Sequence, residues 1–328
     1  QTFYEYVSAG CAQFFKGEQK ITSLLSLDEG SITISATETA LHCCLLQAIE
    51  SFRELHPNVT FRILNNSSSD SVIALRQGQV DKAVLILCPC YGDWSEYVLQ
   101  ACRDYPEQFT ASAFFDPWSP AARQYYTEKL EGPLWKNIKI EFSEAGGLYG
   151  VYPGVQLDAP ELRWLWEAME AGGKTVSFDL GRPGDGSYQT DQIASIAKRH
   201  PGLKLVLCHM GQPSRTAERD PKLWSAWLEQ IRLGTLPNVW FDLSALPYHV
   251  REEEEYPFPS TKRYFDLARR IVGAEKLLWG TDIPWLLGTA NYQQLVAHGK
   301  FLLSDCTEKE REMIFAENAW DVYWNHRK

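Results

Sequence analysis

The sequence predicts an α/β protein whose parallel sheet curls into a (β/α)₈ barrel of the TIM type, with an atypical first strand. Two observations predict this class. Apolar, strand-like runs alternate with amphipathic helical segments along most of the 328 residues, which is the pattern of parallel strands joined by helical crossovers. Several of these runs end abruptly in a polar or charged side chain, as barrel strands do where they open onto a site.

Composition limits the functions that this chain can have. Hydrophobic residues make up 45% of the sequence, enough for a substantial core, and the net charge of -10 disfavours a nucleic-acid surface. The eight cysteines include no Cys-x-x-Cys pair, which we interpret as reduced thiols of a cytoplasmic protein. The sequence shows neither a membrane span nor a secretory signal.

The N-terminal part predicts a β-α-β-α-β segment. Period-two alternation marks its first strand, and the dipeptide His56-Pro57 ends the helix before its second strand. We expect helices over residues 1–29, 39–55 and 72–76 and strands over residues 31–36, 59–64 and 81–88.

Three stretches of this segment, Gly30–His42, Phe52–Arg62 and Ala74–Asp81, resemble the start of the effector-binding domain of LysR-type transcriptional regulators. Residues 1–29 are similar to the linker helix of that family, so the resemblance covers residues 1–85. No DNA-binding helices precede it, and the second half of the effector domain is missing. The resemblance therefore implies a linker helix and a partial effector-binding segment over residues 1–80, followed by a separate domain over residues 81–328.

The remainder of the chain continues the alternation in a regular order. Seven strands, one fewer than a complete (β/α)₈ barrel has, are expected from residue 84 onward. We expect strands over residues 84–87, 110–115, 138–142, 175–178, 203–208, 238–243 and 277–280, and helices over residues 94–104, 119–130, 160–171, 190–199, 223–233 and 261–272.

The last of these strands ends in the stretch Gly280–Trp285, where Asp282 follows the apolar run Leu277–Trp279. An acid at this position is a metal ligand, a general base, or the N-cap of the next turn. Three motifs in order, His209–Gly211, Gly280–Trp285 and Ile314–Ala319, resemble the amidohydrolase-related family of metal-dependent hydrolases, which includes decarboxylases and lactonases. The resemblance covers about residues 80–324 and implies a TIM-barrel fold.

The resemblance also implies a site. Members of the family carry His-x-His on the first barrel strand, a His at the end of the fifth and of the sixth, and an Asp at the end of the eighth. The sixth-strand His matches His209, the eighth-strand Asp matches Asp282, and Asp179 occupies the fifth-strand position. The His-x-His has no counterpart, because the first strand would have to be Val59–Leu64. We interpret this as an apparent fusion in which a regulator-like piece replaces the first strand.

The candidate catalytic residues are Asp282, as general base, and His209, as electrophile or ligand. Together with Asp179 they would form a metal site for Zn or Mn, and a metal-free site is the open alternative. Each residue also has a structural interpretation. His209 is otherwise a core histidine bonded to a backbone carbonyl, and Asp179 a cap of the turn before Gly181.

The candidate substrate-binding residues are Glu141, Arg182 and Tyr188. Glu141 lies on the opposite strand face from its apolar neighbours and is either an inward acid or an outward charge. Arg182 is either a clamp for a substrate carboxylate or a solvated surface residue, and Tyr188 lies in the same loop. His249 follows the strand over residues 238–243 and is a further candidate for the mouth of the barrel.

We therefore predict an amidohydrolase-family hydrolase, or a related decarboxylase or lactonase, acting on a small carboxylated or ring substrate. The alternatives are a LysR-like small-molecule sensor fragment and an inactive fusion without the first-strand ligands. A small-molecule substrate is the expected partner, nucleic acid and membrane are not, and a homo-oligomer remains open.

Overall fold

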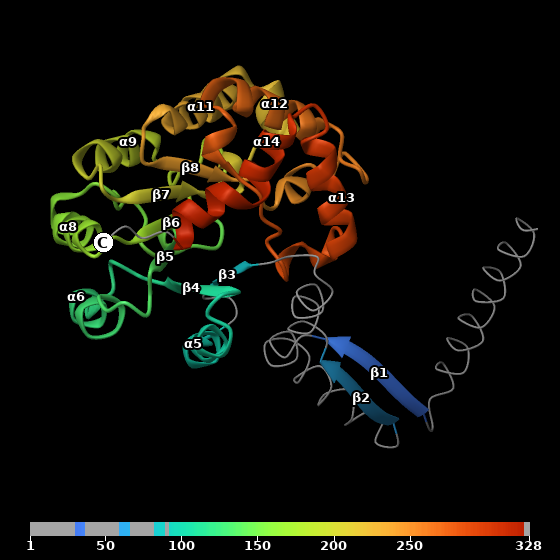
Figure 1. Cartoon of the computed structure of the whole chain (residues 1–328), viewed down its shortest axis with the longest axis horizontal. Helices are drawn as coiled ribbons and strands as arrows, with labels where there is room; N and C mark the ends of the chain where they lie inside the picture. Colours follow the sequence, from blue (N-terminus) through green and yellow to red (C-terminus); the bar gives the residue numbers. More distant parts are fainter. Residues whose placement is uncertain (1–29, 37–58, 66–81, 89–91, 325–328) are drawn as a thin grey trace, which may run out of the picture. The chain divides into compact units, whose positions relative to one another are not determined.

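The computed structural model describes residues 30–36, 59–65, 82–88 and 92–324 of the chain (Figure 1). The chain divides into two compact units, residues 1–80 and residues 81–328. The helices predicted over residues 1–29, 39–55 and 72–76 lie outside the described residues.

The described part of the first unit is a pair of parallel strands. Strand β1 (Gly30–Ala36) pairs with β2 (Val59–Asn65) in register from Gly30 opposite Val59 to Ala36 opposite Asn65. Both strands agree with the predicted ones. The third strand expected in this segment is β3 (Ala83–Ile86), and it pairs with β4 in the other sheet. The predicted β-α-β-α-β order is therefore divided between two sheets.

The second unit contains a seven-stranded sheet in which neighbours in the chain are neighbours in space, in the order β3-β4-β5-β6-β7-β8-β9. All six pairings are parallel. Within the described residues the edge strands β3 and β9 do not pair with each other, so the curled sheet is a half-barrel. This confirms the predicted TIM-barrel-like α/β class. The strands after β3 are β4 (Phe109–Phe114), β5 (Asn137–Glu141), β6 (Thr175–Asp179), β7 (Lys204–Leu207), β8 (Val239–Asp242) and β9 (Leu277–Leu278).

Helices follow the strands, and Figure 1 shows α8, α9, α11 and α12 on one side of the central strands. Four helices, α7, α10, α13 and α14, lie outside the predicted series. For α13 a signal was present, because Asn291 and Gln294 form a capping box at its start.

The helices are α5 (Ser95–Asp104), α6 (Ala122–Tyr125), α7 (Leu148–Val151), α8 (Arg163–Ala171), α9 (Thr190–Arg199), α10 (Arg215–Arg219), α11 (Pro221–Arg232), α12 (Ser260–Val272), α13 (Tyr292–Leu302) and α14 (Glu308–Glu312). Short 3₁₀ or π segments are η3 (Tyr126–Leu130), η4 (Pro160–Leu162), η5 (Cys208–Gly211), η6 (Leu233–Thr235), η7 (Leu246–His249), η8 (Ala274–Lys276), η9 (Trp285–Gly288), η10 (Met313–Glu317) and η11 (Trp320–Trp324).

The two faces of the strands bury different side chains. Ile138, Ile140, Val176 and Phe178 are fully buried and belong to the main hydrophobic core between sheet and helices. The opposite face holds a second, smaller apolar cluster that includes Val206, Leu278, Val322 and Tyr323. The last described segment, η11, thus packs Val322 and Tyr323 against the inner face of the sheet. This contact lies on the amino-terminal side of the strand ends that carry the charged residues.

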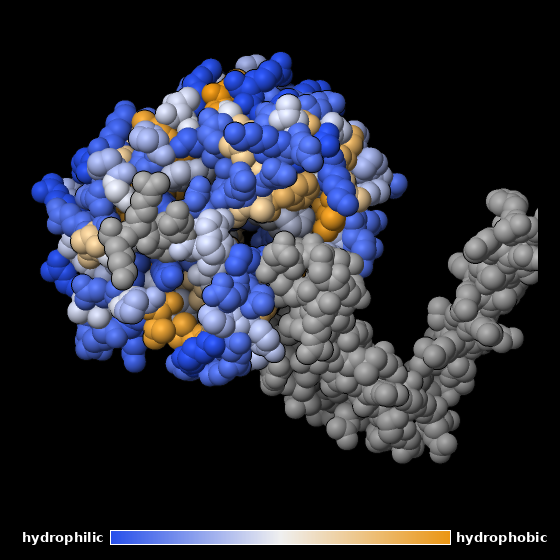
Figure 2. Space-filling model, in the orientation of Figure 1, coloured by the Kyte–Doolittle hydropathy of each residue, from blue (hydrophilic) through white to orange (hydrophobic). Residues whose placement is uncertain are grey.

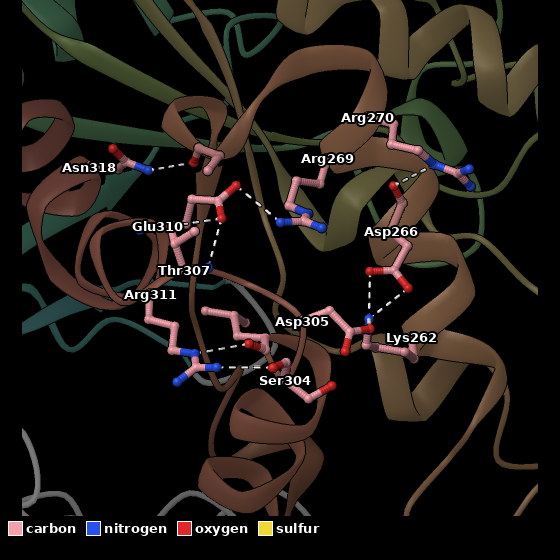
Figure 3. A network of polar contacts seen from close by, with 12 residues as sticks. Lys262, Asp266, Arg269, Arg270, Ser304, Asp305, Thr307, Glu310, Arg311 and Asn318 are labelled. Atoms are coloured by element: carbon pink, nitrogen blue, oxygen red, sulfur yellow. Dashed lines mark hydrogen bonds and ion pairs between the residues drawn. The ribbon is translucent and has the colours of Figure 1, made fainter.

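The C-terminal motif anchors β9. The side-chain amide of Asn318 donates hydrogen bonds of 2.8 Å to the carbonyl oxygens of Ala274 and Leu277, and the N–H of Trp279 donates to the carbonyl of Ile314. Figure 3 shows Asn318 beside a network of ion pairs between α12 and the segments around α14, including Lys262 with Asp305 and Arg269 with Glu310. These contacts fix the strand that leads directly to Asp282.

The surface of the second unit is mainly hydrophilic in the view of Figure 2, with apolar side chains in small groups. Among the described residues no helix has the length and apolar character needed to cross a membrane.

Candidate active site

Five ionisable side chains gather at the carboxyl end of the seven-stranded sheet. Glu141 ends β5, Asp179 ends β6, His209 follows β7, Asp242 ends β8 and Asp282 follows β9. Glu141 lies directly opposite Asp179 in the strand register. Parallel strands in chain order open on one edge, where barrel enzymes carry their sites. The structure therefore brings together the three residues predicted from the motifs and Glu141, the predicted substrate-binding acid, and adds Asp242.

His209 is buried, and both nitrogens of its ring have partners. Nε2 lies 3.3 Å from Oδ2 of Asp179, and Nδ1 lies 2.9 Å from the hydroxyl oxygen of Ser244. Burial alone would lower the pKa of His209, but nearby carboxylates, led by Asp179, raise it to about 10. Burial would raise the pKa of Asp179, yet the His209 cation beside it holds that pKa below its usual range. The two side chains form an ion pair at neutral pH.

The turn that carries His209 has a left-handed backbone, with φ of 58° at His209 and 50° at Met210. This conformation costs a non-glycine residue roughly 1–2 kcal/mol, so the surroundings must hold it. The indole N–H of Trp227 donates to the carbonyl of Met210, and the hydroxyl of Tyr188 donates to the carbonyl of Gly211, each at 2.9 Å. Tyr188, a predicted substrate-binding residue, therefore supports this turn through its hydroxyl.

Asp242 is a site residue that sequence reasoning missed. Its Oδ1 accepts the backbone N–H of His209 at 2.9 Å and that of Ser244 at 3.1 Å, and it also accepts the Ser244 hydroxyl. A chain of hydrogen bonds thus runs from the His209 ring through Ser244 to Asp242. A signal existed in the sequence, because Asp242 ends an apolar strand in the same way as Asp179.

Asp282 differs from the other carboxylates of the site. Its backbone is left-handed, with φ of 56°, and no hydrogen bond reaches its carboxylate from the residues that the structure describes. Burial raises the pKa of Asp282, while the positive charges of His209 and Lys139 limit the rise. A carboxylate with free oxygens and a raised pKa is suited to accept a proton from water.

Lys139 lies on the inner face of β5, two residues before Glu141, and only 5% of it is exposed. Its Nζ is 3.2 Å from Sγ of Cys208 and 3.4 Å from Oε2 of Glu141. Burial opposes the charge, but Cys208, Glu141 and Asp179 raise the pKa of Lys139 well above its usual value. Glu141 also accepts the Ser143 hydroxyl at 2.7 Å. Of the two orientations that the sequence left open, Glu141 is therefore the inward acid, and it forms a buried ion pair.

The rim of the site carries positive charge. Arg182 is exposed, and together with His209 and Arg251 it lowers the pKa of His249, after the larger effect of burial, to about 3. The neutral ring of His249 lies 5.9 Å from the ring of His209. Its Nε2 is buried and has no hydrogen-bond partner among the described residues. Arg182 thus lies close enough to His249 to affect its charge, and its role as a carboxylate clamp stays a prediction.

The donors of the predicted metal site are Asp179, His209 and Asp282. Among residues 82–88 and 92–324 no three His, Cys, Asp or Glu side chains are arranged to hold a metal ion. Both ring nitrogens of His209 have protein partners, and both oxygens of Asp179 accept protein N–H groups, from Gly181 and Gln212 on one side and His209 on the other. The described residues therefore do not fit a divalent metal. Of the three predicted ligands, Asp179 and His209 pair with each other.

The fold and this arrangement of strand ends are those of a barrel hydrolase. The chain belongs to the amidohydrolase family, because the profile described as Amidohydrolase matches residues 62–323. The match begins within β2 and thus before residue 80, where the sequence placed the start. It overlaps the segment compared with LysR-type regulators, and nothing in the comparisons supports that interpretation. No curated protein matches the chain.

Solved structures of the same superfamily share the fold. A protein from Pseudomonas putida described as a 2-pyrone-4,6-dicarboxylic acid hydrolase is 17% identical with a TM-score of 0.62, covering 92% of this chain and 99% of that chain. A Burkholderia multivorans amidohydrolase with bound Zn is 14% identical (TM-score 0.58; 90% and 98% covered). A 5-carboxyvanillate decarboxylase from Sphingomonas paucimobilis is 16% identical (TM-score 0.53; 90% and 99%). These likenesses show that the chain shares the fold of these proteins.

Proposed function

We propose that this protein hydrolyses a small carboxylated ring ester, with Asp282 as the general base. The observation that carries the proposal is the partly buried carboxylate of Asp282 at the strand ends, which lies near the His209 cation and the Lys139 ammonium. Nothing in the described residues occupies the Asp282 oxygens. A base and a positive field on one reacting group are the two requirements of ester hydrolysis.

The reaction follows from these positions. Asp282 accepts a proton from water, and the hydroxide attacks the carbonyl carbon of the ester. The His209 cation, which pairs with Asp179 at 3.3 Å, stabilises the oxyanion through its positive charge. The C–O bond then breaks, and the leaving oxygen takes the proton held by Asp282. Asp242 and Ser244 keep the His209 ring oriented.

The proposed substrate class is inferred from the positively charged residues at the rim of the site. Arg182 and Arg251 lie near His249, and a guanidinium is the usual partner of a carboxylate. The Pseudomonas putida neighbour, described as a hydrolase of 2-pyrone-4,6-dicarboxylic acid, suggests a dicarboxylated ring lactone as the first compound to test. A divalent metal, present in the Burkholderia multivorans neighbour, is not needed in any of these steps.

Decarboxylation is the second candidate, favoured by the 5-carboxyvanillate decarboxylase among the neighbours. The raised pKa of Asp282 would then serve the opposite role, because a carboxyl that keeps its proton can deliver it to the ring carbon from which CO₂ leaves. Release of CO₂ without uptake of water distinguishes this reaction from hydrolysis.

The test is turnover of 2-pyrone-4,6-dicarboxylate and 5-carboxyvanillate, followed by loss of ring absorbance and by CO₂ release. We expect wild-type turnover of one of them, and a loss of about 100- to 10,000-fold in kcat/KM for Asp282→Asn. Asp305→Asn is the matched control, because the Asp305 side chain is 74% exposed in an ion pair on the outer surface, and it should retain full activity.

Two results contradict the proposal. Equal activity of Asp282→Asn and wild type would remove Asp282 from the chemistry. Absence of turnover, combined with thermal stabilisation by small carboxylates that survives Asp282→Asn, would favour the alternative of a small-molecule sensor.

A further inference from the structure

The turn that carries His209 is left-handed over four consecutive residues. The angle φ is 58° at His209, 50° at Met210, 68° at Gly211 and 54° at Gln212, and the N–H of Gln212 donates to the carbonyl of His209 at 2.9 Å. The left-handed conformation costs roughly 1–2 kcal/mol at each of the three residues other than glycine. Strain of this kind persists only where the surroundings impose it, and it is found mainly at functional sites.

The closed turn brings the side chains of its first and last residues to one acceptor, Asp179. In a turn closed by a hydrogen bond between residues i and i+3, these two side chains lie on the same side. Nε2 of His209 faces Oδ2 of Asp179 at 3.3 Å, and the side-chain amide of Gln212 donates to Oδ1 at 2.7 Å. All three residues are buried, with at most 9% of each exposed.

The two oxygens of Asp179 are thus divided between different partners. Oδ1 accepts the backbone N–H of Gly181 at 2.9 Å as well as the Gln212 amide, and Oδ2 is left for His209. The final torsion of an aspartate side chain has a broad energy minimum, so one donor from the same loop leaves the carboxylate group able to turn. A second donor, from the turn after β7, fixes that rotation.

We propose that Gln212 is a positioning residue of the active site, acting through Asp179 on the His209 cation. Because it holds Oδ1, it presents Oδ2 to His209 and keeps the charged ring in one orientation. The strained turn is explained in the same way, since it is what allows His209 and Gln212 to reach the same carboxylate. The inference rests on the proposed function for the part that His209 plays in the reaction, whereas the arrangement itself can be measured without a substrate.

Gln212→Met removes the donor at nearly constant side-chain volume, and Gln189→Met is the matched control. Gln189 is also a buried glutamine, 6% exposed. Its side-chain amide binds two backbone groups, the N–H of Leu157 at 2.9 Å and the carbonyl of Val155 at 2.8 Å. Both substitutions remove buried hydrogen bonds and should lower stability, but only Gln212→Met should change the His209 ring.

The first measurement is the NMR signal of the Nε2–H proton of His209, recorded on the full chain near neutral pH and assigned by its absence in His209→Gln. We expect this signal to broaden in Gln212→Met, because the Asp179 carboxylate then samples more than one orientation. In Gln189→Met it should match wild type.

The second measurement is turnover of 2-pyrone-4,6-dicarboxylate or 5-carboxyvanillate, whichever the wild type accepts. In Gln212→Met we expect kcat to fall about 10- to 100-fold with KM within about twofold of wild type, because a misplaced catalytic group slows the reaction more than it weakens binding. Gln189→Met should keep the wild-type kcat.

A His209 signal in Gln212→Met that matches wild type would overturn the inference, and so would an unchanged kcat in an active enzyme. If Gln212→Met does not fold, Gln212→Asn takes its place. Asparagine tolerates the left-handed backbone but is one methylene too short to keep the 2.7 Å contact with Asp179, so it should broaden the signal in the same way. Absence of turnover in wild type would be a failure of the proposed function alone, and the NMR comparison would still decide the inference.

Discussion

The amino end of β6 (its lower end) and the carboxyl end (its upper end) carry different kinds of polar contact. At its lower end the hydroxyl of Thr175 donates to the carbonyl of Val322 at 2.6 Å, and the hydroxyl of Ser177 pairs with that of Tyr323 at 3.1 Å. At its upper end Asp179 is in an ion pair with His209. Neutral hydrogen bonds fasten the lower end to the C-terminal segment, whereas the upper end holds charges in place. Both ends therefore contribute to stability, and the charged groups suited to chemistry lie at the upper end.

Backbone strain follows the same division. The left-handed residues before the lower ends of β6 and β9 are glycines, Gly173 with φ of 61° and Gly273 with φ of 85°, and glycine adopts this conformation without strain. Beyond the upper ends, a left-handed backbone is adopted by His209, Ala245 and Asp282, none of which is a glycine. Such strain persists where the surrounding structure imposes it, typically at functional sites.

The largest expected effect is on the pH dependence of stability. The pKa of His209 is about 10 in the folded chain and about 6.5 in an unfolded one. Its contribution is therefore complete below pH 6.5 and is lost as the pH rises through 10, which amounts to a loss on the order of 4–5 kcal/mol. Urea unfolding between pH 6.5 and 10 should show this loss in wild type and not in His209→Gln.

His298→Gln is the control for this measurement. Burial lowers the pKa of His298 to about 4, so its effect on stability lies below pH 6.5. This variant should lose stability between pH 6.5 and 10 as wild type does. An equal loss in His209→Gln would show that the ion pair with Asp179 does not form.

The second-largest expected effect is the loss of stability when Asp242 is replaced. Asp242→Ala removes the acceptor of three hydrogen bonds, from the N–H of His209 and from the N–H and hydroxyl of Ser244. We expect about 3 kcal/mol of destabilisation, because the buried donors and the His209 cation lose their partner. Asp220→Ala is the matched control, since Asp220 is the exposed N-cap of α11 and such a cap is worth about 1 kcal/mol. Denaturant midpoints compare them.

The smallest expected effect tests whether backbone strain is stored beyond the upper ends of the strands and not at their lower ends. Gly173→Ala should destabilise the protein by about 1 kcal/mol, through φ alone, because an added Cβ would meet nothing within 4 Å. Ala245→Gly should have the opposite sign, by at most about 1 kcal/mol, because its φ of 57° is then free of strain. A destabilised Ala245→Gly would show that no strain is stored at this upper turn.

Much of the fold could be predicted from the sequence, because the seven strands from β3 to β9 are near-continuous apolar runs separated by amphipathic helices. The first strand could not. Val59–Asn65 has the pattern of a strand, but alternation alone does not say which sheet it joins, and in the structure it pairs with Gly30–Ala36. Local pattern determines that a strand forms, whereas its partner depends on contacts far along the chain.

The site was predictable where a motif marked a strand end, as at His209 and Asp282, and it was missed where only burial marked the residue. Lys139 alternates with Ile138 and Ile140, which are fully buried. In a parallel sheet both faces are covered, so a lysine opposite buried isoleucines must point inward. Its partner Cys208 comes from another strand, and no spacing in the sequence reveals that contact.

The central claim is that the upper strand ends form one active site with Asp282 as base, and the pH profile of kcat/KM tests it most directly. The pKa of Asp282 is raised from its value of 3.8, and that of His209 is about 10. Wild type should therefore gain activity as Asp282 ionises above pH 3.8 and lose it as His209 deprotonates near pH 10, and Asp282→Asn should lack the acidic limb. The same acidic limb in Asp282→Asn, with kcat/KM within about threefold of wild type, would contradict the account.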